Sequence, residues 1–261
     1  MDERVVTLPI GYNVDGKIYK NVVLRPLSGR ALLEARGKIG ERVDPSLFVD
    51  LLRSVVVRVE DLDAPFRPDL MYFVDADFIF YQLALWEHEM SGDKMMVQRQ
   101  CTVCQKSVKF EIRESDVTVK PVEATEWGKY PDLQIPFKLR VPIKTLDPDG
   151  KPYDTGKIRL LTLADEVEKF KRYGDSPGRM WSETVRMMIS QLGPKSYGSI
   201  FPADFDQLPA YEIKKIEQIY ASNMPGVEAP SELICPSCQG QSQVNPAIMW
   251  VPDFLLLPSG G

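Results

Sequence analysis

Four cysteines constrain this chain more than any other feature, because they form two pairs of identical spacing. Each pair reads C-x-x-C, and the chain contains no fifth cysteine. This spacing lets two thiolates and the backbone amides between them wrap one side of a tetrahedral Zn²⁺. In a cytoplasmic protein such cysteines are metal ligands or redox groups more often than disulfides. We therefore expect one closed, structural zinc site, whose ligands are Cys101, Cys104, Cys235 and Cys238.

The wide separation of the two pairs leaves two other interpretations open. Cys-Pro-Ser-Cys at 235–238 is a motif of thiol–disulfide redox centres, which normally open a helix after a strand. Residues 108–112, after the first pair, alternate in polarity as a strand does, which argues against that setting. The remaining interpretation is four cysteines that stay free.

The chain repeats itself at an offset of 134 positions. Asp15-Gly16-Lys17 recurs as Asp149-Gly150-Lys151, Arg25 falls on Arg159, and the two cysteine pairs coincide. Such an offset is the mark of a duplicated unit. We expect two modules, residues 1–120 and 138–261, joined by a proline-containing linker at 121–137. Packing about a pseudo-twofold axis would bring both cysteine pairs to that axis, where they would share one ion.

Each module has the same expected order of elements, which predicts an α+β fold. Asp-Gly between apolar runs is a strong hairpin signal, and it joins predicted strands at 8–12 and 19–25. Ser28 is a predicted N-cap, and Thr162 with Asp165 resembles a capping box. With one residue of slippage before the turn, the internal repeat also aligns residues 8–10 with residues 141–143. Helices are expected at 28–39, 46–59 and 76–90 in the first module, and at 162–173, 180–192 and 210–223 in the second. Strands are expected at 95–100 and 108–112, on either side of the first cysteine pair; each pair with its loop is called a knuckle below.

Several classes of function lack their motifs. The chain has no phosphate-binding glycine loop, no dinucleotide fingerprint and no nucleophile elbow. Its one histidine, His88, has no second histidine four residues away, and Asp147, Asp149 and Asp154 do not follow the calcium-loop pattern. A net charge of −5 suits a phosphate backbone poorly. We expect no enzyme, no small-molecule substrate and no nucleic-acid partner.

Membrane and export signals are not evident. Residues 1–4 lack the apolar core of a secretory signal, and the apolar stretch 78–86 is too short to span a bilayer. That stretch is apolar on nearly all sides, as buried helices are, whereas its counterpart in the second module is more polar. We expect no membrane partner, and a protein partner or an inter-module contact over this helix.

The order of these features resembles a family of phage proteins, the zinc-knuckle baseplate hub and tail-assembly proteins of T-even-type contractile-tailed phages and related injection systems. The residues that carry the resemblance are Leu8-Pro9-Ile10, Asp15-Gly16-Lys17, Leu24-Arg25-Pro26-Leu27-Ser28-Gly29-Arg30, Met90-Ser91-Gly92-Asp93 and the first cysteine pair. The second module departs from it by reading Leu160-Leu161-Thr162-Leu163-Ala164 at the junction after its second strand.

The resemblance implies a non-enzymatic structural or assembly role. Its partners would be other phage tail or baseplate proteins, and its location the host cytoplasm during assembly or the virion tail. Two alternatives stay open. A zinc-ribbon nucleic-acid binder needs basic and aromatic residues around its knuckles. Lys106 and Lys109 flank the first knuckle, but the second is followed by Gln239, Gln241 and Gln243. The other alternative is a C-x-x-C thiol oxidoreductase.

Overall fold

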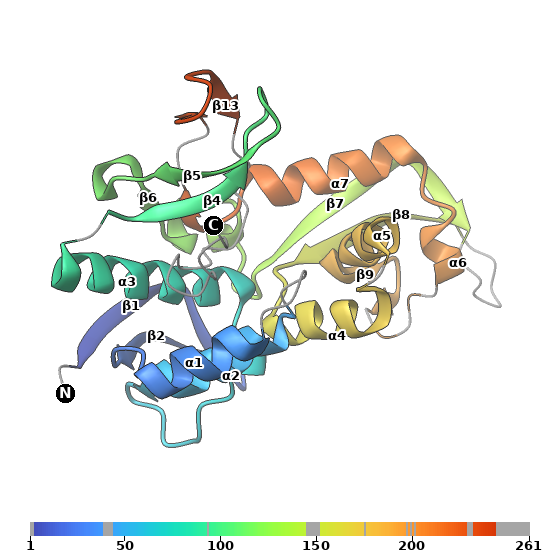
Figure 1. Cartoon of the computed structure of the whole chain (residues 1–261). Coiled ribbons are helices and arrows are strands. Elements are labelled where there is room, and N and C mark those ends of the chain that lie inside the picture. The colour runs from blue at the N-terminus through green and yellow to red at the C-terminus, as the bar shows by residue number, and fades with distance from the viewer. Residues whose placement is uncertain are drawn as a thin grey trace. The chain divides into compact units, whose positions relative to one another are not determined.

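The computed structural model describes residues 3–38, 44–92, 94–144, 152–174, 176–196, 198, 200, 202–228 and 232–243. The chain divides into two compact units. Unit 1 combines Met1–Pro121 with Pro225–Gly261, and unit 2 is Val122–Met224. Helices and antiparallel sheets occur in both, so the predicted α+β class is confirmed (Figure 1).

Unit 1 begins with a three-stranded antiparallel sheet of order β1-β2-β3. Its strands are β1 (Arg4–Val14), β2 (Lys17–Leu24) and β3 (Val56–Val59). Asp15 and Gly16 both have positive φ, 51° and 83°. Two such residues between paired strands form the type I′ turn that suits the strand twist, so the predicted hairpin is confirmed.

The helices of unit 1 are α1 (Gly29–Lys38), α2 (Ser46–Val55) and α3 (Phe73–Ser91), with a short 3-10 turn η1 (Pro68–Leu70). Ser28 accepts a hydrogen bond from the Ala31 amide, as an N-cap does. Helix α3 lies between the β1–β2–β3 sheet and the strands of the cysteine hairpins (Figure 1). Its residues are buried on nearly every side, which confirms that it is a core helix.

Short antiparallel pairs complete unit 1. Strands β4 (Met96–Gln100) and β5 (Ser107–Glu111) flank the first cysteine pair, and β12 (Glu232–Ile234) and β13 (Gln241–Gln243) flank the second. Strand β6 (Thr118–Lys120), which follows the 3-10 turn η2 (Glu114–Asp116), pairs with β11 (Gly226–Glu228).

Unit 2 holds a four-stranded antiparallel sheet of order β10-β9-β8-β7. Helices α4 and α5 pack together, and α7 runs along β7 (Figure 1). The strands are β7 (Gln134–Lys144), β8 (Pro152–Arg159), β9 (Ile189–Leu192) and β10 (Lys195–Ser196). The helices are α4 (Leu163–Tyr173), α5 (Pro177–Met188), α6 (Pro202–Phe205) and α7 (Ala210–Ser222), and two 3-10 turns, η3 (Val122–Ala124) and η4 (Trp127–Lys129), precede the sheet.

The two larger sheets share their irregularities. In unit 1 the stretch from Thr7 to Tyr12 faces the shorter stretch from Asn21 to Tyr19, and in unit 2 residues 138–143 face 155–153 in the same way. A second register shift falls between Val23 and Leu24 in β2 and between Lys157 and Ile158 in β8. Equivalent bulges therefore lie at equivalent places in both sheets.

The structure corrects two predicted helices at their ends. Helix 46–59 stops at Val55, and helix 180–192 stops at Met188. The residues that follow form β3 and β9, each paired to the open edge of a hairpin. Three of the four residues of Val56-Val57-Arg58-Val59 are β-branched, and pairing with β2 satisfies the backbone polar groups that face that strand. Tertiary pairing overrides the helical pattern there.

Other predictions meet the structure only in part. When the two hairpins are matched by their strand pairing, residue 8 of β1 corresponds to residue 139 of β7. The sequence repeat aligns residue 8 with residue 141 instead, so the two matches differ by two positions. Asp147 and Asp149 lie outside the described residues. Among the described helices, none combines the length and apolar character that a bilayer crossing needs.

Candidate metal centre

Two hairpin loops bring the four cysteines together in unit 1. All four Sγ atoms lie within 4.8 Å of one another. Cys101 and Cys104 belong to the loop between β4 and β5, and Cys235 and Cys238 to the loop between β12 and β13. The predicted ligand set is therefore assembled at one point, although 130 residues separate the two pairs in the sequence.

The sulfur spacing fits a tetrahedral ion. A metal–sulfur bond of about 2.3 Å in a regular tetrahedron separates neighbouring sulfurs by about 3.8 Å. The Cys101–Cys238 and Cys104–Cys235 Sγ distances are both 3.9 Å. All four thiols are free, and a disulfide would need sulfurs about 2 Å apart. These residues fit a metal ion bound by four thiolates.

The equal distances also reveal a local twofold relation. Exchanging the two knuckles converts the Cys101–Cys238 pair into the Cys235–Cys104 pair. The loops have the same backbone: the amide of Cys101 donates to the Lys106 carbonyl at 2.9 Å, and that of Cys235 to the Gly240 carbonyl at 3.0 Å. Gln105 and Gln239 both have positive φ, 61° and 59°.

The electrostatics of the cluster favour a bound cation. The amides of Cys104 and Val103 point at the Cys101 sulfur, 3.5 and 3.3 Å away, and lower the pKa of Cys101 to about 6. The Gly240 amide lowers the pKa of Cys238, but desolvation and the three neighbouring cysteines outweigh it and raise that pKa to about 11. Four thiolates at this spacing therefore repel one another unless a positive ion lies between them.

Burial differs among the ligands. Cys101 and Cys235, the first cysteine of each pair, are fully buried, whereas Cys104 is half-buried and Cys238 is exposed. The centre therefore has a solvent-facing side, through which an ion can enter or a chelator can act.

Two supporting residues were not predicted from the sequence. Ser242 is fully buried, and its Oγ accepts the Thr102 amide at 3.1 Å, so it ties the second hairpin to the first loop. A Cβ on Gly240 would lie 3.2 Å from the Val103 side chain. A glycine beside the second cysteine pair could have indicated this contact from the sequence, because glycine allows the backbone to approach a neighbouring side chain closely. Nothing in the sequence distinguishes Ser242 from other serines.

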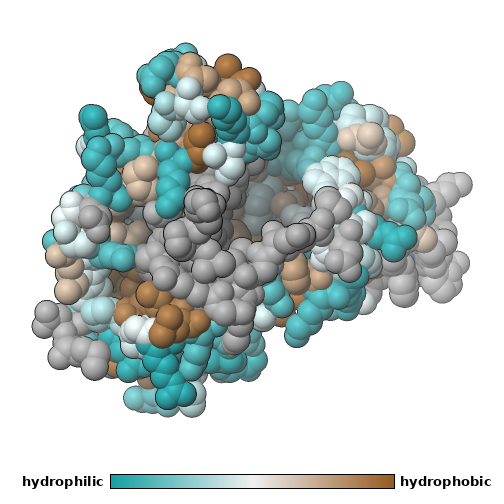
Figure 2. Space-filling model, viewed as in Figure 1, coloured by the Kyte–Doolittle hydropathy of each residue, from teal (hydrophilic) through white to brown (hydrophobic). Residues whose placement is uncertain are grey.

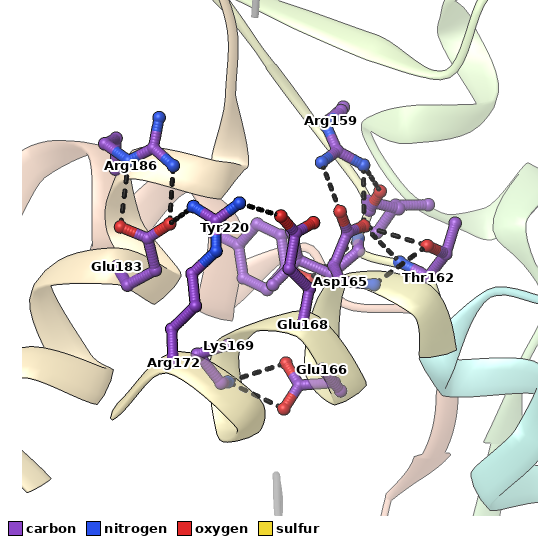
Figure 3. Close-up of polar contacts among 12 residues, drawn as sticks. Arg159, Thr162, Asp165, Glu166, Glu168, Lys169, Arg172, Glu183, Arg186 and Tyr220 are labelled. Atoms are coloured by element: carbon purple, nitrogen blue, oxygen red, sulfur yellow. Dashed lines mark hydrogen bonds and ion pairs between the residues drawn. The ribbon is translucent and has the colours of Figure 1, made fainter. Parts of the chain in front are cut away.

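A second cluster of charged side chains lies in unit 2 (Figure 3). Arg159 binds Asp165 with two hydrogen bonds of 2.8 and 2.7 Å, and Asp165 also accepts the Thr162 amide in a capping box. Burial raises the pKa of Asp165, but the guanidinium of Arg159 and the bonds from Thr162 outweigh it, so the net shift is downward. The predicted capping box is confirmed.

The other acids of this cluster are also paired. Glu183 binds Arg186 and lies 4.0 Å from Arg172, which links α4 to α5. The remaining pairs are Lys169 with Glu166 and Arg172 with Glu168. A cation therefore engages each of these carboxylates, and the contact of Arg172 with Glu183 joins α4 to α5 within unit 2.

An apolar groove opens on unit 1 beside α3. It encloses about 330 Å³ and is lined by residues that include Pro26, Leu83 and Trp86. Met90, at its edge, is 72% exposed. Figure 2 shows apolar surface in the region of α1 and α3. Pro26 and Leu27, which line the groove, belong to the strand-to-helix junction at residues 24–30.

Comparison with protein-family models, curated proteins and solved structures finds no match to this chain.

Proposed function

We propose that this protein is a non-enzymatic structural or assembly protein that folds around one structural Zn²⁺. The observation that carries the proposal is the closed set of four thiolates in unit 1. Four protein ligands fill a tetrahedral ion and leave no position for water or substrate. Such an ion contributes to folding and does not act as a Lewis acid on a substrate.

The chemistry of the ligands favours zinc. Thiolates are soft ligands that select zinc, copper(I) or iron–sulfur chemistry over magnesium and calcium. A single tetrahedral site with sulfurs 3.9 Å apart has the geometry of structural zinc knuckles. The zinc would be held by Cys101, Cys104, Cys235 and Cys238.

The shared irregularities of the two halves support an internal duplication as part of the proposal. Sheet register, helix order and knuckle backbone all recur. An acid at the third position of the last long helix also recurs: Asp75 accepts amides from β1, and Glu212 accepts an amide from β7. A duplicated module accounts for these likenesses, although the two acids are 137 positions apart and the sequence repeat has an offset of 134.

The assignment to a contractile phage tail or baseplate rests on the sequence resemblance. Exposed apolar residues at the α1–α3 groove are consistent with a protein that binds other proteins. A thiol oxidoreductase is less favoured, because both cysteine pairs lie in hairpin loops and face one another.

Metal analysis of the purified chain tests the zinc centre. We expect one zinc per chain by elemental analysis, and Cys235→Ser should lose it and lower the melting temperature by about 10 °C or more. Ser237→Ala, in the same loop, is the matched control and should keep the ion. A metal-free native chain that melts like the loaded one would refute the structural role.

Gene inactivation tests the assembly role. In a phage that encodes this chain, a nonsense mutation should yield particles with defective or missing tails in electron micrographs, and the wild-type gene supplied in trans should restore them. Normal tails in the mutant would contradict the assignment.

A further inference from the structure

Unit 1 is built from two stretches of chain that meet at a two-stranded ribbon and at the four cysteines. The chain leaves the unit after Pro121 and returns at Pro225. Strand β6 ends at Lys120, β11 begins at Gly226, and these two residues are direct partners in the antiparallel pair. The departing and returning chains therefore pass side by side.

The returning stretch, residues 225–228 and 232–243, is attached to the rest of unit 1 in two places among the described residues, at β11 and at the second cysteine pair. Strands β11 and β6 pair over three residues, and Lys120 lies 3.6 Å from Glu228. Gly226 approaches the Val74 side chain of α3 so closely that a Cβ would clash. A ribbon this short is not stable by itself.

The knuckle contacts supply the other attachment. Thr102 donates its amide to Ser242, and Val103 packs against Gly240. The apolar surface that joins the stretch to the unit is limited to Pro225, Val227 and Leu233, its buried aliphatic side chains in the described range. Metal–thiolate bonds would therefore be the strongest link between the two stretches.

We propose that the metal centre is a latch: removal of the ion releases strands β11, β12 and β13 from the rest of unit 1 while unit 2 stays folded. This inference rests on the metal site of the proposed function. Release uncovers the β6 edge and the side of α3 that Gly226 covers, so the ion controls access to a backbone edge that can pair with another strand.

The interactions of unit 2 explain why it stays folded. Its sheet is formed by β7 to β10, and the pairs Arg159–Asp165, Glu183–Arg186 and Lys195–Asp204 all lie within Val122–Met224. Leu163, Met187 and Leu192 are fully buried. None of these contacts includes a cysteine or a residue of the returning stretch.

Hydrogen–deuterium exchange on the full chain tests the latch. Metal content is measured first; the loaded chain is then compared with the same chain after chelation, and with the Cys235→Ser and Ser237→Ala variants. We expect exchange of the amides in β6, β11, β12 and β13 to rise at least tenfold on chelation and in Cys235→Ser. Exchange in α4, α5 and β8 should change less than twofold, and Ser237→Ala should behave as the loaded wild type.

Each other outcome has a defined meaning. A purified chain without metal overturns the metal centre, and the latch with it. A loaded chain whose β6 and β11 amides stay protected after chelation overturns the latch alone. Equal loss of protection in both units also overturns it, because the ion would then support the whole fold. Since chelation acts on the wild-type chain, the test does not depend on whether Cys235→Ser folds.

Discussion

Asp75 is a buried carboxylate that holds the bulge of the first strand in place. It lies in the first turn of α3, is fully buried, and accepts the amides of Ile10 and Gly11 at 2.9 Å each. Burial raises its pKa to about 7, although the two amides and the charge of Lys20 act to lower it. The folded chain therefore binds the Asp75 proton more tightly than the unfolded chain does.

This pKa predicts the sign of a pH effect on stability. An unfolded aspartate titrates near its ordinary value of 3.8, so the contribution of protonated Asp75 is present below about pH 4 and is lost as the pH rises to about 7. Asp75→Asn cannot ionise, and its free energy of unfolding should vary less between pH 4 and 7 than that of wild type. Urea titrations across this range measure the difference. Equal slopes for the two proteins would show that Asp75 ionises freely in the folded state.

The sequence predicts residues well where the chemistry is local. The four cysteines, the Asp15-Gly16 turn and the Thr162 cap each need only their neighbours or their chemical type to be recognised. Asp75 was not predicted, because its role depends on amides of β1 that lie far away in the sequence. A buried acid at a helix start looks, in sequence, like an ordinary exposed one.

Elements were predicted well in type and less well at their ends. The hairpins and long helices follow their patterns, but β3 and β9 were assigned to the ends of helices. Both strands pair with the second strand of a hairpin, β2 or β8, along the edge that the hairpin partner does not occupy. A short apolar run does not distinguish a helix end from a buried strand by periodicity. The same error at β3 and at β9 shows that the pattern itself is ambiguous.

The pairing of β7 with β8 depends on a glycine. A Cβ on Gly156 would lie 2.6 Å from the Gln191 carbonyl of β9 and would also meet the ring of Phe137, its partner in β7. Gly156→Val should therefore destabilise unit 2 by about 2–4 kcal/mol through overpacking and displaced strands. Gly178→Ala in α5 is the control, because its Cβ meets nothing and helix propensity favours alanine by about 0.5–1 kcal/mol. Urea unfolding followed by circular dichroism measures both, and equal stability of the two variants would contradict this role for Gly156.

At the scale of the whole molecule, the chain does not divide in space as its sequence repeat does. The repeat describes the sequence as two consecutive modules. The compact units are drawn differently, because unit 1 contains both the first 121 residues and the second cysteine pair. Sequence patterns describe contiguous segments, so a discontinuous unit gives no compositional signal. The cysteines nevertheless revealed the long-range contact, because a tetrahedral ion needs four ligands and each pair supplies two.

A shared metal centre predicts strongly non-additive substitutions in distant parts of the chain. Cys101→Ser and Cys235→Ser remove one ligand from each pair, and the two sulfurs belong to one cluster although 134 positions separate them. If both knuckles bind the same ion, the first substitution already removes most of the free energy of metal binding. The double variant should therefore be little less stable than either single variant. Chemical denaturation of the four proteins, with metal content measured in parallel, completes the cycle. Additive losses, or single variants that each keep half of the wild-type metal, would indicate two separate centres and contradict the shared site.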